Sequence, residues 1–238
     1  MSDPFGMWFT NDSGDYQVDG NYWNYTFQQK GTVTFPTASV YGYFAPQSIT
    51  YTSSYGSSGS PLCFVQCSSN PVAVWGGVLS SGVYTFSFAT IIGSASQAGF
   101  SFNYYIFDQP PTPPTSGFSM EIFNSSGTCV FDATQKYMRI VDVTSVGAYS
   151  GGFPTASVSL SSGTYAGIVG AGRTAMTVLS NGGLNQPFLQ IDGIQVTSTG
   201  ATASCSCYSF LGGSGYTPGT TPINQHATEF VVIDVSTY

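Results

Sequence analysis

Side chains that could do acid–base chemistry are few in this sequence, and their spacing matches no familiar catalytic pattern. The single histidine, His226, lies three residues before Glu229. A serine hydrolase needs a histidine held by an acid, beside a serine on a sharp turn, and no Gly-x-Ser-x-Gly sequence occurs. We therefore interpret His226 as a solvated loop residue and predict that the chain is not an enzyme.

Carboxylates form two further candidate groups. Asp12, Asp15 and Asp19 could offer oxygen ligands to calcium, but their spacing is not that of an EF-hand loop. Asp108 and Asp234 end two similar predicted strands, and glycoside hydrolysis uses a pair of carboxylates. Asp108 and Asp234 occupy equivalent positions, so we favour structural roles for them. The second half has Ser125 and Thr128 in place of Asp12 and Asp15, so we predict no metal or other cofactor.

The five cysteines are grouped as Cys63 and Cys67, Cys129 alone, and Cys205 and Cys207. Residues two or four apart in a strand point to the same side, so each pair shares one face. A structural zinc site needs four converging ligands, and these pairs belong to different predicted domains. The sequence has no secretory signal, so we expect synthesis in a reducing cytoplasm and five buried thiols without disulfides.

Aromatic residues are the strongest remaining signal for binding. Tyr22, Trp23 and Tyr25 place large rings on both faces of one predicted strand, and Tyr41 and Tyr43 follow. One face must be core, so rings on the other face could bind a neighbouring subunit or the flat face of a sugar. These five residues are the predicted binding or interface residues, and an aromatic core plus a contact between sheets is the alternative interpretation.

The elements that would position these residues are repeated. The segment Phe5–Asp19 aligns without a gap with Phe118–Asp132, at an offset of 113 residues (118 − 5). The segment Phe35–Val40 recurs letter for letter as Phe153–Val158. A repeat of this length predicts two tandem copies of one unit rather than turns of a solenoid.

Each copy begins with a predicted β-hairpin. In Phe118–Asp132, alternating residues flank the break Asn124-Ser-Ser-Gly127, which suits a type I turn followed by a glycine bulge. Asp19 and Asp132 are expected to bond backbone amides at turns or strand ends. A third strand is predicted at residues 22–27 and 136–141, and the loop 212–228 is the predicted variable contact surface.

Short strands at regular spacing predict an all-β protein of two tandem, internally duplicated β-sandwich domains. Their predicted bounds are residues 1–109 and 117–238, joined by a Pro-rich linker at residues 110–116. Charged residues make up only 6% of the chain and the formal net charge is −7. This balance argues against nucleic acid and membrane insertion, and a surface with so little charge favours a homo-oligomer.

The duplicated hairpins, with the segments Pro61–Val65 and Phe230–Asp234, resemble small accessory virion proteins of tailed bacteriophages. The resemblance implies a location at the tail tip or baseplate of a virion, other virion proteins as partners, and a trimer as the preferred oligomer. It brings no catalytic residues. We thus expect a non-enzymatic structural protein; the alternatives are a receptor- or carbohydrate-binding module at the tail tip and a capsid decoration protein.

Overall fold

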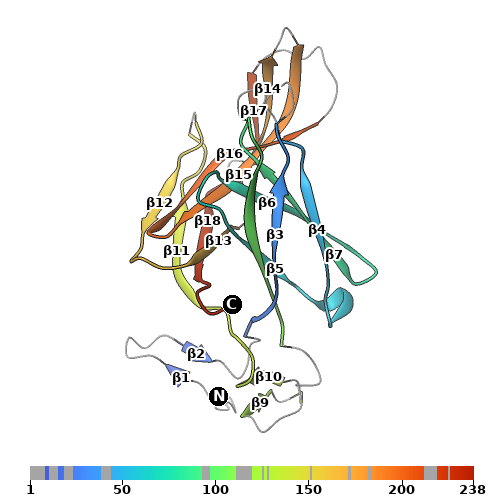
Figure 1. Ribbon diagram of the computed structural model, residues 1–238, viewed down its shortest axis with the longest axis vertical. Helices are drawn as coiled ribbons and strands as arrows, with labels where there is room; N and C mark the ends of the chain where they lie inside the picture. Colours follow the sequence, from blue (N-terminus) through green and yellow to red (C-terminus); the bar gives the residue numbers. More distant parts are fainter. Residues whose placement is uncertain are drawn as a thin grey trace.

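The structure is a computed structural model, and it describes residues 9–10, 16–18, 24–38, 44–92, 97–110, 120–124, 126–127, 129–150, 152–170, 173–181, 184–211, 219–224 and 226–238. Within these ranges the chain forms strands and one short 3₁₀ helix, η1 (Gly56–Ser58), so the predicted all-β class is confirmed. Figure 1 shows two large sheets in the middle of the molecule and two small hairpins at one end.

The strands occur in nearly the same order in both halves of the chain. Those of the first half are β1 (Phe9–Thr10), β2 (Tyr16–Val18), β3 (Thr26–Phe35), β4 (Gln47–Thr52), β5 (Leu62–Gln66), β6 (Val72–Ser80), β7 (Val83–Thr90) and β8 (Phe100–Asp108). Those of the second half are β9 (Glu121–Phe123), β10 (Cys129–Asp132), β11 (Ile140–Val146), β12 (Ala156–Ser159), β13 (Tyr165–Val169), β14 (Thr174–Asn181), β15 (Leu184–Thr197), β16 (Gly200–Phe210), β17 (Gly219–Asn224) and β18 (Thr228–Asp234).

One sheet is antiparallel, with the strand order β11-β18-β13-β5-β8-β3. Each half contributes three adjacent strands, and the halves meet where Gly167 of β13 lies opposite Val65 of β5. In both blocks the last strand of the half lies in the middle, between two earlier strands. The same pairing plan therefore occurs twice, as a duplication of the sequence would require.

The second sheet also combines both halves. Its order is β12-β16-β7-β6-β15-β14-β17, with β4 paired to β7 and with β15 also paired to β16. The halves meet at Val72 opposite Ile194 and at Thr90 opposite Tyr208. Strands β14 and β17 have no counterpart among the described strands of the first half, and in Figure 1 they lie at the end opposite the hairpins.

The two halves do not form two separate sandwiches in the described parts of the chain, which differs from the predicted domains 1–109 and 117–238. Each half alone supplies only three strands to the six-stranded sheet, and separate domains would leave β5 and β13 as open edges. Joining these strands pairs backbone groups that would otherwise be exposed at two edges. Of the predicted linker, only Pro110 lies within the described residues; its carbonyl accepts a hydrogen bond from Tyr55.

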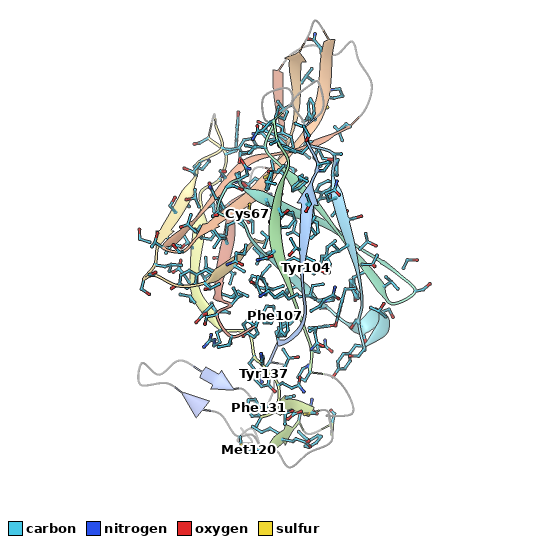
Figure 2. All side chains as sticks on the ribbon, in the orientation of Figure 1. Cys67, Tyr104, Phe107, Met120, Phe131 and Tyr137 are labelled. Atoms are coloured by element: carbon cyan, nitrogen blue, oxygen red, sulfur yellow. The ribbon has the colours of Figure 1, made fainter. Side chains whose placement is uncertain are left out.

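Alternating side chains of β8 explain where the core lies. Phe102, Tyr104 and Ile106 point to the main core between the sheets. Tyr105 and Phe107 point to the other face, where a second apolar cluster is formed. Residues from both halves belong to both clusters, so the molecule has one shared interior rather than two separate ones. Figure 2 labels Tyr104 and Phe107 on this strand.

The two hairpins have matching registers. Phe9 pairs with Val18 in the first, and Ile122 pairs with Phe131 in the second, which agrees with the 113-residue offset. Both hairpins carry a register shift at equivalent places. In the second turn the backbone nitrogen of Gly127 donates to the Asn124 carbonyl over 3.0 Å, and Gly127 has a φ of +78°, as the turn prediction requires.

Two predicted elements differ from the structure because long-range pairing decides their limits. The third strand of each half is β3 and β11, shifted toward the C-terminus from the predicted 22–27 and 136–141. Thr26 pairs with Asp108 and Phe35 with Phe100, so the length of β8 sets the bounds of β3. The predicted loop 212–228 contains β17, which pairs with β14.

Candidate functional site

Most of the predicted binding aromatics lie outside the described residues; these are Tyr22, Trp23, Tyr41 and Tyr43. The fifth, Tyr25, is half-buried against the second apolar cluster. Its hydroxyl donates to the carbonyl of Ser60 over 3.1 Å. Burial raises the pKa of Tyr25, and the nearby charge of Asp108 adds to this effect. Tyr25 thus contributes to internal packing.

Asp108 is a buried carboxylate at the end of β8. Its Oδ2 accepts hydrogen bonds from the Tyr51 hydroxyl at 3.1 Å and from Ser53 Oγ at 2.6 Å. Its Oδ1 accepts from the backbone nitrogen of Gln109 at 2.9 Å. These bonds join the end of β8 to β4 and to the segment that follows it. Burial raises the pKa of Tyr51 above its ordinary value, so it remains a hydrogen-bond donor at neutral pH.

Asp234, the equivalent residue of β18, has a more open setting. It pairs with Arg139 at 2.9 Å, and the two side chains are 30% and 47% exposed. Its Oδ1 also accepts from the backbone nitrogen of Ser236 at 2.8 Å. Burial raises the pKa of Asp234, but the hydrogen bonds from Ser236 and the charge of Arg139 outweigh it, so this pKa lies below its ordinary value. Asp108 and Asp234 therefore lie apart, each held by its own structural contacts.

Asp132 has the predicted role of a turn residue. Its Oδ1 accepts hydrogen bonds from the backbone nitrogen of Thr134 at 2.9 Å and from the Thr134 hydroxyl at 2.8 Å. Beside this turn, the rings of Phe131 and Tyr137 stack with centroids 4.7 Å apart, as Figure 2 shows between the hairpin and the sheets. The acidic residues of the first hairpin, Asp12, Asp15 and Asp19, lie outside the described residues.

All five cysteines are free and buried, as predicted for small apolar side chains. Burial raises the pKa of Cys205 to about 12, with a further contribution from the charge of Asp192. Burial also raises the pKa of Cys63 and Cys207. The thiol of Cys207 lies 3.5 Å from the carbonyl of Pro71, so this second-half cysteine packs against the first half. In the described parts of the chain, no three histidine, cysteine or acidic side chains are grouped as a metal site would need.

A buried ion pair lies in the second half, and the sequence patterns did not reveal it. The side chains of Arg173 and Asp192 are both fully buried, and their charged groups approach to 2.7 Å, from Nη2 to Oδ1. Arg173 also donates to the Gly147 carbonyl over 2.8 Å. These contacts fix the start of β14 against β15. The sequence has only four basic residues, and Arg173 lies in a predominantly apolar segment, so it could have been singled out as a candidate for a buried, paired charge.

Strand β11 is an edge with exposed apolar side chains. Among the described strands, its one partner in the six-stranded sheet is β18. Ile140, Val141 and Val143 are 56%, 43% and 51% exposed. An edge strand carries unpaired backbone donors and acceptors, and natural proteins commonly block such edges with lysine, proline or a bulge. Here the seven-residue strand has neither lysine nor proline, although its register shifts once, between Ile140 and Asp142.

The opposite edge of the same sheet, β3, is different. When β8 and β18 are aligned by their last residues, Asp108 and Asp234, Tyr105 corresponds to Val231. Lys30 lies opposite Tyr105 and Val143 lies opposite Val231, so Lys30 and Val143 occupy equivalent positions. Lys30 is exposed, its Nζ lies 5.2 Å from the centre of the Tyr105 ring, and it donates to the Tyr238 carbonyl over 3.2 Å. The β3 edge of the sheet therefore carries a lysine at the position where the β11 edge exposes a valine.

A polar hollow of about 530 Å³ lies where the halves meet. Its walls come from the ends of β3, β5 and β8 in the first half and from the segments around β13 and the β15–β16 turn in the second. Cys67, labelled in Figure 2, lines it beside Gln66 and Asn103. None of its lining residues carries a formal charge. Sequence patterns could not predict this hollow, because its walls come from strands whose pairing joins the two halves.

His226 lies just before β18 and Glu229 lies at its start, and both are exposed. Glu229 Oε1 lies 3.5 Å from the hydroxyl of Ser145 on β11. Among the described residues, no helix is long and apolar enough to span a membrane. No protein-family model, curated protein or solved structure matches this chain.

Proposed function

We propose that this chain is a non-enzymatic structural component of a bacteriophage virion, at the tail tip or baseplate, that it mediates assembly or attachment of neighbouring tail proteins, and that its own copies join through the β11 edge. The phage setting is supported by the sequence resemblance of the duplicated hairpins. The use of the edge is supported by one observation above all. An apolar edge strand is exposed at the position where the equivalent strand of the same sheet carries Lys30.

The physical basis is strand addition. A strand from a neighbouring chain can pair with the free backbone groups of β11, and its side chains can cover Val141 and Val143. Burial of apolar area stabilises such a contact by roughly 25 cal/mol for each Å² removed from water. Only 6% of the residues are charged, so few charged side chains have to lose water at such a contact, while the net charge of −7 on each copy opposes association.

We further propose a trimer. A three-fold ring requires a head-to-tail contact, in which β11 of one copy meets a different surface of the next copy. A two-fold dimer would instead pair β11 with β11. The mass of the assembled species therefore distinguishes the two modes of edge pairing.

Sedimentation velocity over a range of protein concentrations tests this function. The wild-type chain should form a species of three times 25.1 kDa. Val143→Lys should remain a monomer, because it places a lysine on the exposed edge, whereas Thr34→Lys on β3 should associate as the wild type does. A wild-type monomer that is also missing from virions would refute the proposal, as would a Val143→Lys variant that associates normally.

The alternatives are a receptor- or carbohydrate-binding module at the tail tip and a capsid decoration protein. Locating the polypeptide in intact particles by electron microscopy separates them. A position between tail subunits, with β11 covered, supports the structural role. A position on the capsid shell, or at the tail tip with β11 uncovered, favours one of the alternatives.

A further inference from the structure

The hollow at the junction of the halves contains a row of polar side chains that crosses three strands. Thr32 of β3 lies opposite Asn103 of β8, and Asn103 lies opposite Gln66 of β5. The Thr32 hydroxyl donates to Asn103 Oδ1 over 2.9 Å. Asn103 Nδ2 then donates to Gln66 Oε1 over 3.2 Å, and the Tyr105 hydroxyl donates to the same oxygen over 2.9 Å. In this arrangement Asn103 uses both ends of its amide, and Gln66 uses its oxygen.

This arrangement leaves one strong donor unused. Because Gln66 Oε1 accepts two hydrogen bonds, Nε2 is the free end of this amide, and no described residue accepts a hydrogen bond from it. Ser68, Thr164 and Ser198 line the same hollow, and their hydroxyls can both donate and accept. Phe102, Val196 and Cys67 add apolar atoms to the lining. Each of these apolar side chains is at most 3% exposed, so the accessible surface of the hollow consists mainly of neutral hydrogen-bond donors and acceptors.

The second half shows that the fold does not require this row. Its equivalent hollow, of about 360 Å³, is lined by Ser145, Gly170 and Glu229. Glu229 is the equivalent of Asn103, and Ser145 lies opposite it as Thr32 lies opposite Asn103. On the other side of Glu229, Gly170 takes the place that Gln66 has beside Asn103. The same backbone arrangement thus exists with no amide side chain. A purely structural reason for the Asn103–Gln66 pair is therefore weak.

We infer that the hollow at the junction is a binding site for a neutral saccharide of one or two rings. Each sugar hydroxyl can both donate and accept, which matches an amide donor surrounded by hydroxyl groups. The absence of charged lining residues disfavours phosphate, carboxylate and metal ligands. The volume of about 530 Å³ lies in the usual range for small-ligand sites. This site is separate from β11 and does not depend on assembly through that edge.

Gln66→Glu is the sharpest variant for testing the site. A glutamate can still accept the hydrogen bonds from Asn103 and Tyr105, so the row and the fold are retained. It cannot supply the donor that Nε2 provides, and it brings a negative charge into a neutral hollow. Gln47→Glu, on β4, is the matched control, because the same change there lies outside the hollow.

The experiment is a titration by NMR and calorimetry with glucose, galactose, N-acetylglucosamine and their α- and β-linked disaccharides, and with inorganic phosphate as a charged probe. At least one saccharide should bind to the wild type and to Gln47→Glu, and Gln66→Glu should bind it at least about tenfold more weakly. Thermal unfolding should show that both variants are folded. The inference is overturned if no saccharide binds the wild type at about 10 mM, a concentration where even weak ligands register, if phosphate binds instead, or if Gln66→Glu binds as well as the control.

Discussion

The two edges of the six-stranded sheet have the same place in the pairing plan but opposite surface chemistry. β3 exposes Lys30 and the hydroxyls of Thr32 and Thr34, whereas β11 exposes Ile140, Val141 and Val143. Both strands pair with the last strand of their own half. Among the described residues, β11 has no second partner strand, whereas the start of β3 also pairs at Thr26 with Tyr137. Strand pairing therefore explains the architecture of the sheet, while the side chains of each edge strand determine whether that edge can pair with another chain.

Other equivalent positions differ in the same way. Asp108 is buried and accepts three hydrogen bonds, while Asp234 is partly exposed and pairs with Arg139. The second half also carries β14 and β17, and its buried ion pair holds the start of β14 against β15. Similar backbones thus tolerate different chemistry in the two halves, and substitutions at matched positions can measure how far the halves differ.

The largest loss of stability is expected on breaking the buried ion pair. Arg173→Met leaves the carboxylate of Asp192 buried without its partner, which should lower the free energy of unfolding by about 3–5 kcal/mol. Arg139→Met removes a half-exposed pair and should cost less than about 1 kcal/mol. Urea unfolding measures both. The double variant Arg173→Met with Asp192→Leu should regain most of the loss; equal losses for Arg173→Met and Arg139→Met would contradict the burial argument.

A smaller loss is expected at the buried carboxylate of the first half. Asp108→Ala removes the acceptor for Tyr51, Ser53 and the amide of Gln109, and we expect a loss of about 3 kcal/mol. Asp234→Ala should cost less than about 1 kcal/mol, because water can replace its contacts. Unfolding curves of the two variants test whether equivalent strand ends really differ. A greater loss at Asp234 would reverse this part of the comparison.

The pH dependence of the Asp234 contribution follows from its lowered pKa. A carboxyl whose folded pKa lies below its unfolded value stabilises the fold above the unfolded pKa, near 4, and loses that effect as pH falls through the folded pKa. The stability difference between wild type and Asp234→Asn should therefore shrink between about pH 5 and pH 2. Thermal melting at several pH values would measure it, and a difference that grows on acidification would show the opposite sign.

The smallest effect is expected for the thiols, which are buried in both halves. With the pKa of Cys205 near 12, almost no thiolate exists at pH 8. Alkylation of the native protein without a reducing agent should therefore leave all five cysteines unmodified, and unfolding should expose five reactive thiols. Mass spectrometry distinguishes these states. Fewer than five modified cysteines after unfolding would reveal a disulfide.

Alternation and turn chemistry made much of the fold predictable. The hairpin of the second half follows its predicted turn at Asn124 and Gly127, and its strands β9 and β10 lie within the predicted segment Phe118–Asp132. The sharing of sheets was not predictable in this way. The contact of Gly167 with Val65 joins residues about a hundred positions apart, and no local pattern encodes such a pairing.

The functional predictions depended on local composition, and the candidate sites depend on tertiary structure. Tyr25 has a polar hydroxyl and a large ring, but the second apolar cluster covers it. The row from Thr32 to Gln66 combines residues from three strands, and each is unremarkable in its own segment. The contrast between Lys30 and Val143 could be recognised only once the register of both edge strands was known.

Hydrogen exchange of the backbone amides at low and high protein concentration tests the central claim, that β11 is the assembly edge. Pairing with a neighbouring chain should slow the exchange of β11 amides at high concentration, because a second set of hydrogen bonds forms there. Amides of β3, at the lysine-bearing edge, should exchange at the same rate at both concentrations. Slowed exchange confined to β11, and lost in Val143→Lys, is the expected result. Slowed exchange at β3 without any change at β11 would contradict it.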